Sequence, residues 1–475
     1  MEDGINLYPF DVARVMLYDN RHRNPFLFPE GTLPRARLNT ATLYQRPVEL
    51  LQNLIRFNTT NPPGNETACI TYINGLLKEA GLHTNILSKS KQRTNVIARL
   101  RGEGKAPPLL LYGHVDVVTT EGQKWQHPPF EAQIVDGYLW GRGALDMKSG
   151  VAMLLAAFMK AKVEKASLPG DVIFCAVADE EAGGNYGSRF LVDEHASLFK
   201  DVKYAFSEFG GFNITMGGKR VYPIMVSEKQ RCAMKVTFYG RGGHGSMPLH
   251  HQAMAKLART LNLLDRKNLP YHLTPAVCLM ITKIADAVGG FGKLAIRSLT
   301  SPHLADIVIT SLGGRGELFA PLLHNTITPT MLHASDKINV IPTEVALGLD
   351  GRLLPGFTPQ DMQTEMQALL GSDYELEVVD FDPGPSAPDM GLFDTLGAIL
   401  KEFDPQGIAV PYVMSGVSDA RFFSKLGIQT YGFTPLRLPD DFNFVATIHT
   451  ADERVPVTAL DFGVQAIFKA LQKFH

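Results

Sequence analysis

The sequence predicts an α/β fold in which a mostly parallel sheet, covered by helices, is interrupted by an inserted α+β domain. Two observations support this prediction. Short continuous apolar runs, such as Leu109–Tyr112 and Val172–Ala178, alternate with segments whose apolar residues recur at helical spacing, a pattern typical of buried parallel strands joined through helices. A length of 475 residues also exceeds one ordinary core, so more than one domain is expected.

The N-terminal half begins with an irregular arm and continues as alternating helices and strands. Residues 1–44 mix proline, arginine and aromatic residues without periodicity, and we expect an N-terminal arm there. The first part of the α/β domain is predicted at 45–225. Apolar spacing predicts its elements, which are helices at 47–55, 68–77 and 148–162 and strands at 95–100, 109–112 and 172–178.

The pattern of residues changes near position 226. An inserted α+β domain is predicted from there to residue 382, where a proline-rich joint, Asp382–Pro388, closes it. The α/β domain resumes at 383–475. The elements expected in this half are strands at 345–350 and 427–431 and helices at 359–370 and 458–473.

Composition and charge exclude several classes of function. The formal net charge is −2, with 46 basic and 48 acidic residues and no long run of either sign, so neither nucleic acid nor a membrane is an expected partner. The start of the chain lacks the pattern of a secretory signal, and no apolar stretch reaches the roughly 20 residues of a membrane-spanning helix. We therefore expect a soluble, cytoplasmic protein. The four cysteines are scattered without a Cys-x-x-Cys pair, which argues against a disulfide framework.

Candidate functional side chains follow the predicted strands, where an open α/β sheet places its functional residues. His114 and Asp116 end the first apolar run and, two residues apart, project from the same face. Other candidates stand in glycine-rich or polar stretches further along, at Asp146, Glu180, Glu181, Glu208 and His449. Each has an ordinary alternative: a helix cap for Asp146, solvated loop charges for Glu180 and Glu181, and a satisfied polar residue for His449.

Taken together, these residues indicate a metal centre. One histidine and four carboxylates at successive strand ends would repel one another unless positive charge offsets them. Two divalent metal ions would supply that charge. Two histidines with three carboxylates suit Zn²⁺, and mixed nitrogen and oxygen ligands also suit Co²⁺ or Mn²⁺.

The sequence resembles the co-catalytic zinc metallopeptidase family that contains aminoacylase, carboxypeptidase G, acetylornithine deacetylase and succinyl-diaminopimelate desuccinylase. The branch with carboxypeptidase S and N-acyl amino acid hydrolases is similar in its glutamate at 208 and its long insertion. The matching motifs occur in family order over roughly residues 45–470; they are Gly-His-Val-Asp-Val, Gly-Arg-Gly-Ala-Leu-Asp-Met-Lys-Ser-Gly, Asp-Glu-Glu-Ala-Gly-Gly, Gly-Arg-Gly-Gly-His-Gly-Ser-Met-Pro, Asn-Val-Ile-Pro and a late histidine. The resemblance implies a zinc-exopeptidase-like catalytic domain with an inserted lid and dimerisation domain.

The resemblance also implies roles for the candidate residues. His114 and Glu208 would bind one metal ion, Glu181 and His449 the other, and Asp146 would bridge the two. Asp116 would orient the His114 ring. Glu180 would be the general base that takes a proton from water and returns it to the departing nitrogen.

Four residues of the inserted domain and the C-terminal part match the family's substrate-handling positions. His244 would reach the active site of a partner subunit and stabilise the oxyanion, which predicts a homodimer. Arg352 would hold a substrate carboxylate through its planar guanidinium. Asn325 would hold the substrate through its amide, and Gly416 would offer a backbone N–H to the same carboxylate.

The expected function is a binuclear metal-dependent amidohydrolase or exopeptidase that cleaves an amide next to a free carboxylate, in a dipeptide, at a C-terminal residue or in an N-acyl amino acid. One alternative is an enzyme restricted to N-acyl amino acids or to esters of amino acids. Another is a catalytically silent binding protein on the same scaffold. The presence of Glu180 beside a full set of metal ligands argues against this alternative. A phosphoesterase is disfavoured, because Arg352 and Gly416 are predicted to bind a substrate carboxylate.

Overall fold

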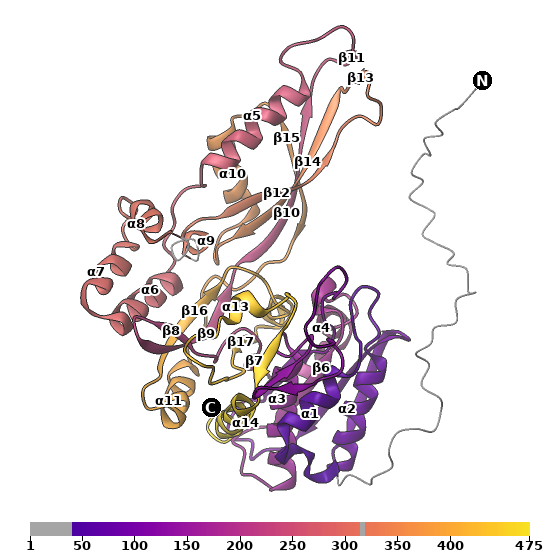
Figure 1. The fold of residues 1–475 in the computed structure, drawn as a ribbon, viewed down its shortest axis with the longest axis vertical. Helices are drawn as coiled ribbons and strands as arrows, with labels where there is room; N and C mark the ends of the chain where they lie inside the picture. The colour runs from indigo at the N-terminus through magenta and orange to yellow at the C-terminus, as the bar shows by residue number, and fades with distance from the viewer. Residues whose placement is uncertain (1–39, 314–318) are drawn as a thin grey trace, which may run out of the picture. The chain divides into compact units, whose positions relative to one another are not determined.

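The computed structural model describes residues 40–313 and 319–475, and most of the predicted arm at 1–44 lies outside them. The main sheet has nine strands in the order β1-β2-β6-β3-β7-β17-β9-β16, with β8 beside β9. Figure 1 labels β6, β7, β8, β9, β16 and β17 of this sheet. The strands are β1 (Thr84–Ser90), β2 (Arg93–Leu100), β3 (Leu109–His114), β6 (Val172–Val177), β7 (Tyr204–Ser207), β8 (Ile214–Met216), β9 (Lys219–Glu228), β16 (Ile408–Met414) and β17 (Gln429–Gly432).

The centre of this sheet is parallel, as predicted, and its edges contain antiparallel pairs. Strands β6, β3, β7 and β17 run in the same direction. Strand β2, which contains the predicted strand at 95–100, pairs antiparallel with β6. The reason is the short connection from β2 to β3, which is below the dozen or more residues that a parallel crossover needs.

Helices cover both faces of the main sheet, and alternate residues of β3 show how. Leu109 and Leu111 point into a core with helices on one face, whereas Leu110 and Tyr112 point into a core on the other. Helix α3 is buried along almost its whole length and apolar on all sides, as expected for a helix inside a large core. The first core contains α1 (Pro47–Ile55), α2 (Thr67–Glu79), α3 (Lys148–Val163), α11 (Phe393–Phe403) and α14 (Val457–Leu471), and the second contains α4 (Ser188–His195) and α12 (Ala420–Phe423).

A second, antiparallel sheet has four strands in the order β12-β14-β10-β15. Two helices, α5 (Ala253–Arg266) and α10 (Pro359–Leu370), lie beside this sheet (Figure 1), and their apolar side chains pack against it. A capping box of Thr358 and Asp361 fixes the start of α10. The strands are β10 (Gln230–Tyr239), β12 (Thr326–His333), β14 (Glu344–Leu353) and β15 (Glu375–Phe381), and a separate pair is formed by β11 (Gly243–His244) and β13 (Val340–Ile341).

The helices between α5 and β12 do not all pack on this second sheet. Helix α6 places Val277 and Ile281 in a core with Val221 of β9 and Val410 and Val413 of β16, which belong to the main sheet. The predicted domain at 226–382 is therefore divided in its packing, and its boundaries stay a prediction. These helices are α6 (Pro275–Val288), α7 (Gly290–Ser298), α8 (Ala305–Leu312) and α9 (Ala320–Leu323).

A small third sheet joins two distant parts of the chain. Strand β18 (Arg454–Pro456) pairs with β5 (Tyr138–Trp140), which pairs with β4 (Ile134–Val135). The pairing holds the segment after His449 beside the segment before Asp146. Among the described helices, none combines the length and apolar character needed to cross a bilayer. The remaining short helices are η1 (Thr40–Gln45), η2 (Glu180–Ala182), η3 (Ala196–Phe199), η5 (Ser424–Leu426) and α13 (Phe444–Thr447).

Candidate metal centre

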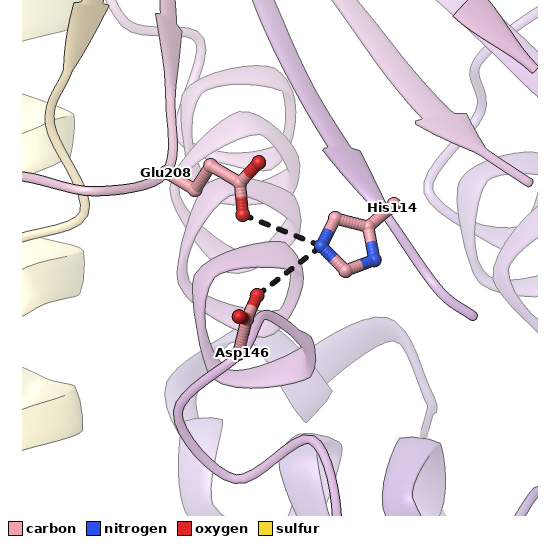
Figure 2. Close-up of side chains that lie close together, drawn as sticks. All are labelled: His114, Asp146 and Glu208. Atoms are coloured by element: carbon pink, nitrogen blue, oxygen red, sulfur yellow. Dashed lines mark hydrogen bonds and ion pairs between the residues drawn. The ribbon is translucent and has the colours of Figure 1, made fainter. Parts of the chain in front are cut away.

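Three side chains from separate segments form a first donor group at the carboxyl edge of the main sheet. His114 ends β3, Glu208 follows β7, and Asp146 precedes α3. The Nε2 atom of His114 lies 3.3 Å from Asp146 Oδ1 and 3.3 Å from Glu208 Oε2. Figure 2 shows both carboxylates turned toward the imidazole ring. All three side chains are buried.

A second donor group shares Asp146 with the first. The Nε2 atom of His449 lies 3.1 Å from Asp146 Oδ2 and 3.3 Å from Glu181 Oε1. This Glu181 oxygen is buried and accepts no hydrogen bond. Asp146 thus presents Oδ1 to one group and Oδ2 to the other, which is the arrangement expected of a carboxylate that bridges two ions.

The donor sets fit divalent metal ions. Donor atoms about 2.0 Å from a tetrahedral zinc ion lie about 3.3 Å from one another, and the distances within both groups are 3.1–3.3 Å where a histidine nitrogen meets a carboxylate oxygen. Imidazole nitrogen and carboxylate oxygen are ligands for Zn²⁺, and also for Co²⁺ and Mn²⁺. The orphaned oxygen of Glu181 gives a further reason for a cation.

Negative charge is concentrated here. Burial, together with repulsion from Asp146, raises the pKa of Glu208 to about 8. Burial and the charge of Glu208 raise the pKa of Glu180 well above its usual range. Close contacts with the carboxylates of Asp146 and Glu181 raise the pKa of His449 to about 10. The carboxylates therefore need added positive charge to stay ionised together at neutral pH.

Asp116 holds both the His114 ring and the loop that carries the two glutamates. His114 Nδ1 lies 3.0 Å from the carbonyl oxygen of Asp116 and 3.4 Å from its Oδ1. The backbone N–H groups of Glu180 and Glu181 donate to Asp116 Oδ1 and Oδ2, each at 3.1 Å. One buried carboxylate thus fixes a donor of the first group, a donor of the second and the predicted base.

Comparison with known proteins identifies the family. Residues 110–473 match the family described as peptidase family M20/M25/M40, and this span is more than half of the chain. The chain belongs to peptidase family M20/M25/M40. As an M20 protein it is a hydrolytic enzyme, namely a metal-dependent amidohydrolase. Its two donor groups agree with the binding of two metal ions per chain.

The M20 chain is similar to several curated proteins. It is 28% identical over 364 residues to the probable carboxypeptidase S-like 2 of Dictyostelium discoideum, covering 74% of this chain and 68% of that protein. It is 27% identical over 386 residues to the human N-fatty-acyl-amino acid synthase/hydrolase PM20D1, covering 77% and 74%. It is 25% identical over 435 residues to human aminoacylase-1, covering 89% and 94%.

Solved structures share the fold at low sequence identity. The M20 family metallo-carboxypeptidase Sso-CP2 from Sulfolobus solfataricus has a TM-score of 0.66 at 16% identity, covering 90% of this chain and 98% of that chain. The Bacillus subtilis protein YXEP, described as a dinuclear metal binding peptidase from the M20 family, has a TM-score of 0.56 at 14% identity, covering 90% and 97%.

A polar cavity of about 500 Å³ lies beside the donor groups of the M20 chain. Glu180 and Glu181 line it together with Arg352 of β14 and Val417, the residue after Gly416. Asp350 holds the Arg352 guanidinium through Nε–Oδ1 and Nη2–Oδ2 contacts of 2.8 and 3.0 Å, whereas Nη1 is buried without a hydrogen-bond partner. Arg352 thus keeps one guanidinium N–H group without an acceptor beside the cavity.

Two other predicted substrate residues lie in different surroundings. Asn325 is buried, donates to Glu365 and accepts the backbone N–H of Leu354 at 2.9 Å. Contact of this amide with a substrate would require these bonds to break. His244 is exposed in β11, and its Nδ1 atom lies 2.7 Å from Ser246 Oγ. Its predicted contribution to a partner subunit stays a prediction.

Sequence reasoning missed a buried network behind Asp116. Asn61 donates to Asp116 Oδ2 at 2.9 Å and to Asp179 Oδ1 at 3.0 Å. Arg93 donates to Asp179 at 2.7 Å and forms a bidentate pair with Glu66, which is fully buried. The signal in the sequence was the turn-forming stretch Asn61-Pro-Pro-Gly-Asn-Glu66, and Asp179 directly after a strand.

Proposed function

We propose that this protein is a binuclear metal-dependent amidohydrolase that cleaves an amide bond next to a free carboxylate. The substrate would be a dipeptide, a peptide with its C-terminal residue, or an N-acyl amino acid. The observation that carries the proposal is the placement of the two Asp146 oxygens in separate donor groups, with Glu180 beside them. The names of two relatives, a carboxypeptidase S-like protein and an N-fatty-acyl-amino acid synthase/hydrolase, support the substrate class.

His114, Asp146 and Glu208 would hold one ion, and Asp146, Glu181 and His449 the other, with Zn²⁺ the expected metal and Co²⁺ or Mn²⁺ as alternatives. Bound ions would polarise the substrate carbonyl and acidify water. Asp116 keeps the His114 ring and the Glu180–Glu181 backbone in place for this task.

Glu180 would move the proton. Its carboxylate faces the cavity and has no role in either donor group, so it is available to accept a proton from the attacking water. The same carboxyl group would then give the proton to the departing nitrogen. A raised pKa suits a group that must hold this proton between the two steps.

Arg352 would bind the free carboxylate of the substrate, because its Nη1 donor is unused and its charge lies on the cavity wall. The backbone N–H of Gly416 would add a second donor. We keep Asn325 as a proposed contact that depends on a rearrangement, and His244 as a proposed contribution from a partner subunit in a homodimer. A cytoplasmic location is part of the same proposal.

A hydrolysis screen tests this function. Metal-free protein is restored with Zn²⁺, Co²⁺ or Mn²⁺ and assayed on dipeptides, N-acyl amino acids, their C-terminal amides and amino-acid esters. We expect turnover that depends on metal and on the free carboxylate. Equal turnover of free acids and amides would contradict the proposed binding of the substrate carboxylate. Absence of turnover on every acid would contradict the proposed amidohydrolase activity.

A further inference from the structure

Arg142 forms a buried ion pair next to the metal centre that has no part in the proposed chemistry. It lies two residues after β5 and is 1% exposed, and its partner Glu453 is 0% exposed. Their Nη1 and Oε2 atoms are 2.6 Å apart. A buried ion pair is weak evidence for a contribution to stability, because desolvation offsets the attraction of the charges. The contacts of the two side chains suggest a different purpose.

The second oxygen of Glu453 holds the backbone at the shared metal donor. Glu453 Oε1 accepts the N–H of Leu145 at 2.7 Å and the N–H of Asp146 at 3.2 Å. The backbone carbonyl of Glu453 also accepts the N–H of Gly141 at 2.9 Å. The loop that ends in Asp146 is thus tied to the C-terminal segment at both of its ends.

Arg142 holds the segment that carries the other donor. Its Nη1 donates to the carbonyl oxygen of Thr450 at 3.2 Å, and its Nη2 donates to Gln123 Oε1 at 2.7 Å. Gln123 Nε2 in turn donates to the carbonyl oxygen of His449 at 2.9 Å. The φ angle of His449 is 60°, a left-handed conformation that residues with side chains rarely adopt. Contacts from outside this segment therefore hold His449 in place.

These contacts are unequal between the two donor groups. In the second group, Glu453 binds the backbone of Asp146, and Gln123 binds the backbone of His449. Arg142 connects Glu453 to Gln123. His114 and Glu208 instead follow strands β3 and β7 of the main sheet, and Asp116 orients the His114 ring. Within residues 40–313 and 319–475, only the shared Asp146 connects the first group to the ion pair.

We propose that Gln123, Arg142 and Glu453 form a clamp that sets the metal affinity of the second donor group. They are positioning residues, because they fix the backbone of Asp146 and His449 without contacting an ion or a substrate. The inference rests on the proposed function in one respect, which is that the two donor groups bind divalent ions. It adds that the ligands of the two ions are held by different contacts: those of the second group by the clamp, and those of the first by the main sheet and Asp116.

Zinc titration of metal-free protein tests the clamp without any assay of turnover. Calorimetry should resolve two binding events in the wild type, and His449→Ala identifies the event that belongs to the second group. Gln123→Met removes the hydrogen bonds that the half-buried Gln123 side chain makes with Arg142, the His449 carbonyl and Trp125. Arg142→Lys keeps the charge but loses the planar guanidinium that contacts several acceptors. Each should weaken the second event about 10- to 100-fold, the usual effect of removing an outer partner of a ligand, and leave the first within about twofold.

Arg220→Met is the matched control, because Arg220 forms a bidentate pair with Asp404 and contacts neither donor group. It should leave both events unchanged. Excess zinc should restore kcat in Gln123→Met with an unaltered KM, which a general loss of structure would not allow. If Arg142→Lys does not fold, Gln123→Met alone decides.

Two results would overturn the clamp while the proposed function stands: both events weakened equally in Gln123→Met, or neither weakened. A wild-type protein that binds no zinc would instead overturn the proposed function, and the clamp with it.

Discussion

The backbone N–H of Glu180 donates to the carboxylate of Asp116 at 3.1 Å, although 64 residues separate them in the sequence. The other Asp116 oxygen takes the N–H of Glu181. We expect Asp116→Asn to lower metal affinity or kcat about 10- to 100-fold, because an amide offers one acceptor oxygen where the carboxylate offers two. Zinc titration and kinetics measure this. Asp171→Asn, at a carboxylate that also accepts a backbone N–H and pairs with arginine, should leave both unchanged.

Glu180 and Glu181 are adjacent, and their substitutions should have different effects. Glu180→Gln should retain two metal ions and lose about 10²- to 10⁴-fold in kcat, the usual contribution of a general acid–base group. Glu181→Gln should lose metal, because it changes a donor of the second group. Elemental analysis of dialysed protein, paired with kcat, separates the two cases. Near-normal turnover in Glu180→Gln would refute its assignment as the base.

Arg352→Met should raise KM about 10- to 100-fold for substrates with a free carboxylate, since hydrogen bonds to charged groups contribute about 1.5–3 kcal/mol. The C-terminal amides of the same substrates should show no further loss. Arg231→Met is a suitable control, because Arg231 lines the same cavity but pairs with Asp380. If Arg352→Met has the same KM as the wild type for substrates with a free carboxylate, that carboxylate binds elsewhere.

Replacing each of two glycines by alanine should change the free energy of unfolding in opposite directions. A Cβ at Gly187 would lie 1.8 Å from the carbonyl oxygen of Ala178, just before the loop of Glu180, whereas a Cβ at Gly75 in α2 would meet nothing within 4 Å. We expect Gly187→Ala to lower the free energy of unfolding by about 1–3 kcal/mol. Gly75→Ala should raise it by about 0.5–1 kcal/mol. Urea unfolding at fixed metal concentration gives both values, and equal effects would show that the close contact at Gly187 relaxes freely.

Glu228 should make stability depend on pH. Burial raises the pKa of Glu228 from 4.5 to about 7 in the folded protein. Below pH 4.5 the group is neutral in both states, and above pH 7 it is charged in both, with the full burial penalty in the folded state. Its contribution therefore lowers stability as pH rises from 4.5 to 7.

Glu228→Gln tests this by unfolding at pH 5 and pH 8. The substitution should remove that slope and stabilise the protein at pH 8 relative to the wild type. Ser418 donates to Glu228 Oε2, and the glutamine oxygen can accept the same bonds. Glu402→Gln is the control with the opposite sign, because Lys469 lowers the pKa of Glu402. An unchanged slope in Glu228→Gln would mean that another group is responsible.

The candidate donors could be predicted from the sequence because local rules place them. His114, Glu181 and Glu208 come at or just after the apolar runs that became β3, β6 and β7, and the parallel centre of the sheet brings those ends together. Helix α1 likewise has clear apolar spacing, and α10 has a terminal signal, the Thr358 capping box.

What could not be predicted depends on contacts between distant segments. Helices α6 and α10 both lie within the predicted inserted domain, yet α6 packs on β9 and β16 while α10 packs on the second sheet. Periodicity shows that a face is buried but not which partner buries it. The links from Asn61 to Asp179, and from Arg142 to Glu453, are single polar contacts across 118 and 311 positions, and no local pattern shows which two residues pair.

The position of β17 between β7 and β9 has a consequence for the order in which the chain is synthesised. Residues 204–207 and 219–228 emerge from the ribosome some two hundred positions before the strand that lies between them. Until residue 432 has been added, the facing edges of β7 and β9 lack their partner, and such open edges invite pairing with other nascent chains. Chaperones that shield exposed strands should therefore matter most while residues 229–432 are being translated.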